Sequence, residues 1–253
     1  MTEVNPTPRH AVEDRRLSGP IGDLVASTLA RVLANFAGRI HERDILAVGP
    51  GSERAAVLFA RGAAVVTAVQ PSEAMLMRAR QRATAELVKI QFRVGDPQAL
   101  NLPDRSFDVA VGLRLLMHTP QWRRPLSELC RVAERLVIVD YFPMMSVSLV
   151  GALLRRLSRM CGGRSAPYYV VTHAAIVDAL EEAGFRVRSV HRQFVLPLAL
   201  HRAIGSRRFT ARAERFLDRL GLVKRFGTPV TLVAERSASL NDPIAEPAAG
   251  RRR

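Results

Sequence analysis

The stretch Asp44–Gly51 (Asp-Ile-Leu-Ala-Val-Gly-Pro-Gly) constrains the fold more than any other part of the sequence. Its apolar run leads directly into Gly49-Pro50-Gly51, and apolar residues at helical spacing follow over 55–60. A short apolar run that ends in Gly-x-Gly and opens a helix is typical of a buried parallel strand, a tight turn and a helix start that faces a nucleotide. Glycine suits such a turn because a side chain would keep the backbone away from a ligand. By itself the motif is a weak signal, so its meaning depends on the chain around it.

Strand and helix patterns alternate after this stretch. Short apolar runs predict strands over 63–70, 89–94, 109–113 and 135–142, and helical patterns lie between them, notably over 72–83 and 125–132. This alternation requires crossover connections, which favour a mostly parallel sheet with helices on both faces. Outside this region the sequence predicts helices over 21–40, 144–160, 172–184 and 196–223, the last interrupted near Gly205, and strands over 185–195 and 228–235. The predicted fold class is therefore α/β, Rossmann-like.

The chain has 253 residues, enough for one large domain without requiring a second. We expect a flexible N-terminal tail over 1–19, one α/β domain over 20–235 and a disordered C-terminal tail over 236–253. Within the domain, we expect a cofactor half over about 41–142 and a substrate or lid half over about 143–235.

The formal net charge of +15 favours an acidic partner, such as nucleic acid, anionic lipid or an anionic substrate. Only Lys89 and Lys224 are lysines, so the charge is almost entirely arginine and is also compatible with a solvated basic surface shaped by composition. Aromatic residues make up only 6%, and no nucleic-acid-binding module is visible, so we expect no nucleic acid partner. The sequence does not predict an oligomeric state.

Cys130 and Cys161 are far apart and have no Cys-x-x-Cys partner, so we expect neither a disulfide framework nor a metal site. The first 16 residues contain no apolar run, so we expect no signal peptide. Together these features favour a cytoplasmic setting, with a peripheral position at a membrane as the alternative.

Residues 44 to about 142 resemble the class I S-adenosylmethionine-dependent methyltransferases, particularly those of ubiquinone and menaquinone biosynthesis. The resemblance rests on segments in the family's order: Ile45–Gly51, Val66–Leu76, Gly95–Pro103, Ser106–Ala110, Leu115–His118 and Leu126–Val132. It implies a seven-stranded sheet that ends in an antiparallel strand pair, which 185–195 and 228–235 would supply.

The resemblance also implies that the chain binds S-adenosylmethionine and transfers its methyl group to a small molecule. Gly49, Pro50 and Gly51 would lie against the methionine part of the cofactor. Gln70, followed by Pro71, would face the ribose hydroxyls, and Asp96 would accept a hydrogen bond from the adenine amino group. The remaining expected cofactor contacts are Pro97 and Gln98 beside the ring, and Leu113 and Arg114 near the sulfonium end.

The chain departs from the family pattern at three positions. Ala47 and Gln70 stand where the family usually has acidic residues, and Glu53 stands where it usually has glycine. Because charged hydrogen bonds are about twice as strong as neutral ones, a neutral Gln70 would weaken cofactor binding by about 1–2 kcal/mol. The alternative is therefore a non-catalytic binding or regulatory protein on the same fold.

On the acceptor side, His118 is the first candidate for a general base, needed if the acceptor is a hydroxyl or an activated carbon. Tyr141 and Met145 are candidate substrate contacts. The predicted helix over 144–160 combines an apolar stripe with arginines and could lie on an anionic membrane, where it would admit an apolar or lipid-like acceptor. Residues 144–226 carry 15 basic and 5 acidic residues. The simpler interpretation of 144–160 is a packed lid helix with a solvated arginine face.

Overall fold

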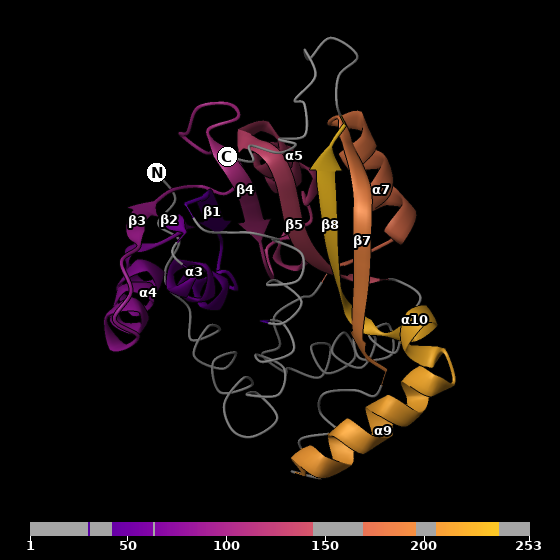
Figure 1. Ribbon diagram of the computed structural model, residues 1–253. Helices are drawn as coiled ribbons and strands as arrows, with labels where there is room; N and C mark the ends of the chain where they lie inside the picture. The colour runs from indigo at the N-terminus through magenta and orange to yellow at the C-terminus, as the bar shows by residue number, and fades with distance from the viewer. Residues whose placement is uncertain (1–29, 31–41, 63, 144–168, 196–205, 238–253) are drawn as a thin grey trace, which may run out of the picture.

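The computed structural model describes residues 30, 42–62, 64–143, 169–195 and 206–237 (Figure 1). The predicted helix over 21–40 lies outside these residues except for residue 30, which is helical. The predicted helix over 144–160, the N-terminal tail, Met145 and the predicted interruption near Gly205 also lie outside them, as do residues 238–253 of the predicted C-terminal tail. The predicted start of that tail at 236 is wrong, because Arg236 is the last residue of β8.

One sheet runs through the described residues, in the order β3-β2-β1-β4-β5-β8-β7. Strands β1 to β5 are parallel to one another, whereas β8 is antiparallel to both β5 and β7. The Rossmann-like fold and the antiparallel pair at the end of the sheet are thus confirmed. The sheet also has a short strand, β6, that pairs with the end of β5. The strands are β1 (Asp44–Val48), β2 (Val65–Gln70), β3 (Gln91–Val94), β4 (Phe107–Gly112), β5 (Ala133–Pro143), β6 (Val170–Val171), β7 (Phe185–Phe194) and β8 (Thr228–Arg236).

The helices cover both faces of this sheet (Figure 1). Side chains alternate between the faces along a strand. On β5, Val137 and Val139 therefore join the core under α5 and α7, whereas Leu136 and Ile138 join the core under α3. The helical segments are α3 (Glu53–Arg61), α4 (Glu73–Ala85), the 3₁₀ turn η1 (Leu116–His118), α5 (Arg123–Val132), α7 (His173–Glu182), α9 (Arg207–Arg219) and α10 (Leu222–Phe226).

Local capping chemistry sets several helix ends. The hydroxyls of Ser72 and Thr172 accept hydrogen bonds from the first turns of α4 and α7, and Gly184 follows α7 with a positive φ of 78°. Between α9 and α10 the chain turns at Gly221, which has a φ of 73°. None of the helices in the described part of the chain has the length and hydropathy needed to cross a membrane.

Strand β1 lies between β2 and β4, so the direction of strand order reverses at this point. In open α/β sheets such a reversal leaves a crevice at the carboxyl ends of the strands, and ligands bind there. The carboxyl ends of β1, β2 and β4 therefore define the place where the candidate site must be sought. We call this side of the sheet the carboxyl edge.

Candidate functional site

The turn Gly49–Gly51 lies at the carboxyl edge and is tied to both neighbouring strands. Gly49 has a φ of +86°, a backbone conformation that favours glycine, and its N–H donates to Val69 O at 3.0 Å. The Gly51 N–H donates to Leu113 O at 3.2 Å. A Cβ at Gly51 would lie only 2.6 Å from that same oxygen. Glycine at 51 is therefore required by the close approach of the chain's own backbone after β4, a reason that the sequence did not reveal.

Ser52, directly after the turn, connects the two strands that flank it. Its fully buried hydroxyl donates to Val48 O at 2.6 Å and accepts from Leu113 N at 3.2 Å. The side chain therefore joins the ends of β1 and β4. The sequence shows only a serine at a helix start, which normally predicts a cap, and the structure has no side-chain cap at this position.

Gln70 is fully buried at the end of β2 and supports the same turn. Its Nε2 donates to Gly49 O at 3.2 Å. Its Oε1 is also buried and has no hydrogen-bond partner among the described residues. Reversing the amide would place Oε1 against a carbonyl oxygen, so the geometry determines which end of the amide faces the turn. Gln70 therefore holds the turn and leaves one buried acceptor atom at the carboxyl edge.

The predicted adenine-side residues follow β3. Gly95 N donates to Gln70 O at 3.0 Å, which brings this segment next to the end of β2. Asp96 is exposed, and its Oδ1 accepts from Gln98 N at 2.8 Å, as expected of a turn-forming aspartate before Pro97. The Oε1 of Gln98 is buried without a hydrogen-bond partner in the described part of the chain.

Leu113 and Arg114 follow β4, and their side chains lie in different surroundings. The Leu113 side chain is fully buried in the core beneath α3. Arg114 has a φ of 56°, and its Cβ lies 2.8 Å from the point that a Cβ at Gly51 would occupy, so its side chain begins against the glycine turn. Arg114 is therefore a basic residue that lies beside the glycine turn.

Asp140, near the end of β5, is a site residue that the sequence did not single out. Its carboxylate accepts a hydrogen bond from Arg114 N, and its burial raises the pKa to about 6, although this hydrogen bond and the Arg114 charge oppose the rise. Thr231 lies directly opposite on β8, fully buried, and its hydroxyl has no hydrogen-bond partner among the described residues. An aspartate inside an otherwise apolar strand, Leu136–Phe142, was the signal that could have found it.

The predicted acceptor-side residues lie farther along the chain. His118 ends η1, is half-buried, and its N–H donates to Leu115 O at 3.3 Å. Tyr141 is fully buried in the core under α5 and α7, and its hydroxyl is hydrogen-bonded to Nδ1 of His173. Burial raises the pKa of Tyr141 to about 12 and lowers that of His173, which favours the neutral form of both groups. This pair fastens β5 to α7.

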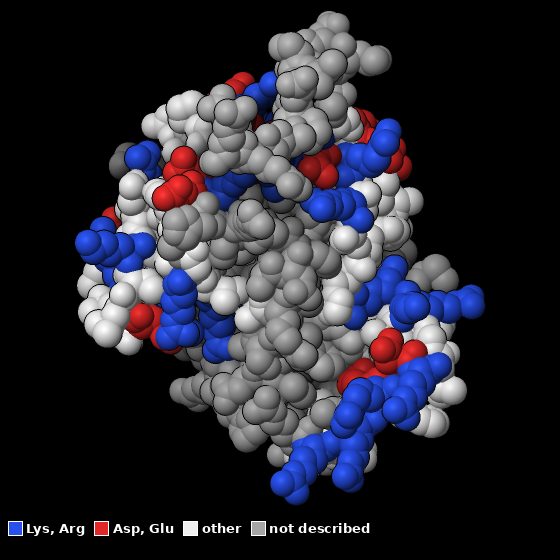
Figure 2. All heavy atoms as spheres, in the orientation of Figure 1, with Lys and Arg blue, Asp and Glu red and all other residues white. Residues whose placement is uncertain are grey.

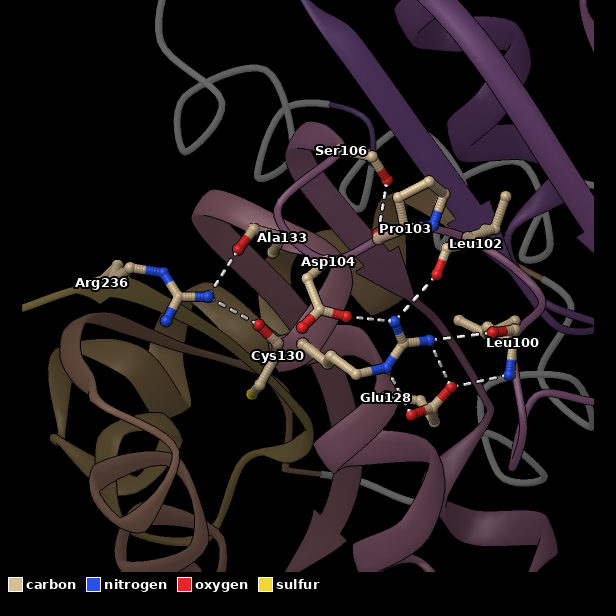
Figure 3. Close-up of polar contacts among 10 residues, drawn as sticks. Leu100, Leu102, Pro103, Asp104, Ser106, Glu128, Cys130, Ala133 and Arg236 are labelled. Atoms are coloured by element: carbon tan, nitrogen blue, oxygen red, sulfur yellow. Dashed lines mark hydrogen bonds and ion pairs between the residues drawn. The ribbon is translucent and has the colours of Figure 1, made fainter.

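Arg131 positions the loop that follows the adenine-side residues. Its guanidinium donates to Glu128 and to Asp104, and also to the carbonyl oxygens of Leu100 and Leu102, each at 2.6–2.8 Å (Figure 3). Glu128 in turn accepts from Leu100 N at 2.7 Å. The loop is therefore joined to α5 by both its backbone and its side chains.

The structure thus brings Gly49, Gly51, Gln70 and Arg114 together at the carboxyl edge, adds Ser52 and Asp140, and places Asp96 one strand away. Pro50 lies within the turn and Pro71 directly after β2. Ala47 is fully buried in the core, and Glu53 lies in the first turn of α3, 3.8 Å from Arg82 of α4. Within the described residues, no group of three His, Cys, Asp or Glu side chains could hold a metal ion.

Comparison with known proteins shows which family this part of the chain is similar to. Residues 46–136 match the family model of a methyltransferase domain. Phosphatidylethanolamine N-methyltransferase of Cereibacter sphaeroides is 35% identical over 104 residues, covering 39% of this chain and 50% of the relative. Demethylmenaquinone methyltransferase of Deinococcus radiodurans is 28% identical over 133 residues, covering 45% and 55%. The chain therefore spans about half the length of these curated relatives.

Solved structures share the fold over a larger part of the chain. Magnesium protoporphyrin IX methyltransferase of Synechocystis PCC 6803 with bound SAH superposes with a TM-score of 0.59 at 18% identity, covering 94% of this chain and 90% of the neighbour. The [4+2]-cyclase SpnF superposes with a TM-score of 0.56 at 19% identity, covering 83% and 81%. At such identities the likeness shows the fold alone. Together with the family match, it confirms the resemblance seen in the sequence: residues 46–136 match a methyltransferase domain, and the chain has the fold of the class I S-adenosylmethionine-dependent methyltransferases.

Proposed function

We propose that the protein binds S-adenosylmethionine at the carboxyl edge and transfers its methyl group to a small-molecule acceptor. The observation that carries the proposal is the glycine turn at the reversal of strand order, beside a buried Gln70 Oε1 that has no partner among the described residues. An unpaired buried acceptor is costly unless a ligand donates to it. A ribose hydroxyl would be such a donor.

Several residues fit the cofactor on this geometry. Gln70 Oε1 would accept from the ribose, and Arg114, beside the glycine turn, would pair with the carboxylate of the methionine part. Asp96 already accepts one hydrogen bond from Gln98 N, but a carboxylate has about four acceptor positions, so it can also accept from the adenine amino group. The expected contacts of Pro50, Pro71, Pro97 and Gln98 remain part of this proposal. Leu113 could contribute only backbone atoms, because its side chain is fully buried in the core.

When bound, S-adenosylmethionine supplies an electrophilic methyl group on a sulfonium, so the chain need only align the acceptor and exclude water. The turn and the Arg114 loop hold their shape through Ser52, Gln70 and Asp140. Half-buried His118, in the segment after β4, would take the proton of a hydroxyl acceptor. Tyr141 would contribute by fixing the end of β5, with Met145 following it in the chain.

We further propose that the methyl acceptor is apolar or lipid-like. One relative is named for phosphatidylethanolamine, a phospholipid, and another for demethylmenaquinone, a quinone. The arginine-rich second half of the chain would favour an acceptor that resides in or near an anionic membrane.

A non-catalytic binding protein is the second candidate, favoured by Gln70 itself. The neutral amide stands where the family usually has an acidic side chain, and its Nε2 donates to Gly49 O. Only one neutral acceptor atom, Oε1, therefore remains for a ligand. The fold by itself does not require methyl transfer, because a protein named as a [4+2]-cyclase, SpnF, has the same fold.

Isothermal titration calorimetry of the full chain with S-adenosylmethionine and its demethylated product tests binding. We expect both to bind, and Gln70→Leu to weaken binding about ten-fold because it removes a buried hydrogen bond and loosens the turn. Gln91→Leu makes the same chemical change at the opposite end of the sheet, at the start of β3, and should leave the affinity unchanged. No heat at hundreds of micromolar of either ligand would exclude the enzyme.

Activity requires a separate measurement. Incubation with methyl-labelled S-adenosylmethionine and lipid extracts or quinone precursors should transfer label to an extractable acceptor. Tight cofactor binding without transfer to any such acceptor would favour the non-catalytic candidate.

A further inference from the structure

Helix α9 has one face that is fastened to the fold. Thr210 is fully buried and Glu214 is only 9% exposed. The Glu214 carboxylate accepts a hydrogen bond at 2.9 Å from Val195 N, immediately after β7. Because this face points inward, the orientation of the helix about its own axis is determined, and so is the face that it presents outward.

The outward side of α9 carries an apolar stripe. Phe209, Phe216 and Leu220 are 45%, 61% and 57% exposed. Their spacing of seven and then four residues places them above one another along the helix and the turn that follows it. Single exposed apolar residues are common on protein surfaces, but a contiguous group marks a site of interaction.

An arginine stripe lies beside the apolar one. Arg208, Arg212, Arg215 and Arg219 are exposed and are spaced by four, three and four residues, and Figure 2 shows a band of basic side chains along α9. Three of these arginines and Phe216 line an open hollow on this helix. Residues 207–225 contain seven basic and two acidic residues, and one of the acidic residues is the buried Glu214.

The helix sits at the carboxyl edge. Strand β7 is antiparallel to β8, which is antiparallel to β5, so β7 ends on the same side of the sheet as the parallel strands. The hydrogen bond from Val195 N to Glu214 holds α9 at that end (Figure 1). The glycine turn of the candidate cofactor site opens on the same side.

We propose that α9 is a docking helix for an anionic membrane surface. Phe209, Phe216 and Leu220 would enter the boundary between headgroups and acyl chains, and the arginine stripe would meet the lipid phosphates. A second copy of the chain is a poor occupant, because a symmetric contact would place like charges together. Nucleic acid would use the arginines but has no hydrocarbon for Leu220 to enter.

Docking through α9 turns the carboxyl edge toward the bilayer, so a lipid acceptor could pass from the membrane to the cofactor site. This consequence rests on the proposed function, whereas docking itself does not. Membrane binding can therefore be measured in the absence of any cofactor, and cofactor binding in the absence of any membrane.

The test is co-sedimentation of the full chain with vesicles of phosphatidylglycerol and phosphatidylcholine in equal amounts, compared with pure phosphatidylcholine. We expect binding to the anionic vesicles only. Changing Arg208, Arg212 and Arg219 to Gln should weaken it on the order of a hundred-fold at low salt. Changing Phe209 and Phe216 to Ser should weaken it about ten-fold or more, because both rings lose their place in the acyl region.

Matched controls lie at the other end of the strand order, on α4, on β3 and in the connection between them. Arg80, Lys89 and Arg93 are also exposed, and their change to Gln removes the same charge. Met77 and Leu87 are 52% and 93% exposed, and their change to Ser removes a similar apolar surface. Both controls should bind vesicles like the unaltered protein. All variants should retain its circular dichroism and its affinity for S-adenosylmethionine.

Equal losses in the α9 variants and the matched controls would overturn the proposal, since binding would then follow total charge or apolar surface. Equal binding to phosphatidylcholine alone would also overturn it. A third result would also overturn it: the protein binds neither vesicle but binds a duplex RNA, and the three arginine changes abolish that RNA binding. If the protein binds vesicles through α9 but does not bind S-adenosylmethionine, the docking proposal stands and the proposed function is wrong.

Discussion

Asp140 gives the carboxyl edge a titratable group near neutral pH. Burial raises its pKa from 3.8 to about 6, so between these values the folded protein holds a proton that the unfolded chain has released. The stability that Asp140 contributes is therefore present below about pH 4 and is lost as the pH rises through about 6. Asn at this position keeps an acceptor for Arg114 N and cannot ionise.

We therefore expect Asp140→Asn to gain stability relative to the unaltered protein as the pH rises, by about 1–3 kcal/mol between pH 4 and pH 7. Urea denaturation at several pH values measures this difference. Asp178→Asn, at an exposed position on α7, controls for the loss of one negative charge. A difference that stays constant over the range would show that Asp140 titrates at its ordinary pKa.

At the residue scale, the sequence identified the position of the site better than the role of each side chain. The glycines were predicted to make room for a ligand, but Gly51 makes room for Leu113 O of the chain itself. Gln70 was predicted to face the ribose, and the structure adds that its amide holds Gly49. Such roles depend on contacts between residues 21 to 62 positions apart, which no local pattern records.

At the element scale, Arg131 determines how firmly the loop over 100–104 is held to α5. We expect Arg131→Lys to lower the free energy of unfolding by about 1–3 kcal/mol, because one ammonium cannot replace a guanidinium that bonds two carboxylates and two carbonyls. Urea denaturation measures the loss.

The matched control for Arg131 is Arg123→Lys. Arg123 pairs with Glu182 at 3.3 Å, and both side chains are more than half exposed, so this change should cost less than about 0.5 kcal/mol. Equal effects at the two positions would mean that the Arg131 contacts add nothing beyond a surface ion pair.

The elements themselves were largely predictable, since their signals are local. Ser72 and Thr172 predicted helix starts that the structure confirms. The strand β6 was not predicted, because a two-residue strand has no periodicity and exists only through pairing with the end of β5. The basic helix predicted over 196–223 appears, within the described residues, as α9 and α10 with a turn at Gly221. Which face of α9 points outward follows from Glu214 and its contact after β7.

At the scale of the whole molecule, the two halves share one sheet. Strand β8, from the second half, lies between β5 and β7, and Arg236 at its end donates to the carbonyl oxygens of Cys130 and Ala133 at 2.8 and 2.7 Å (Figure 3). The Arg236 guanidinium also lies 4.4 Å from the centre of the Phe185 ring on β7. We therefore propose that the halves form one cooperative unit.

Fluorescence of Trp122, the only tryptophan, reports on the start of α5 in the first half, whereas far-ultraviolet circular dichroism reports on the whole chain. We expect both signals to change at the same urea concentration. Arg236→Ala should lower both midpoints together, because it removes carbonyl partners from the end of α5. Two separate transitions would divide the chain into independent units.

The sequence by itself determined the α/β class, the strand–Gly-x-Gly–helix unit and the methyltransferase resemblance, because hydrophobic periodicity and glycine placement are written in neighbouring residues. Only the tertiary structure decided which buried polar atoms lack partners, that Asp140 joins the site through Arg114, and that α9 exposes phenylalanines beside arginines at the carboxyl edge. These properties arise when strands distant in the sequence pair and bury one face of each element. Burial and contact across the sheet then determine what each side chain can do.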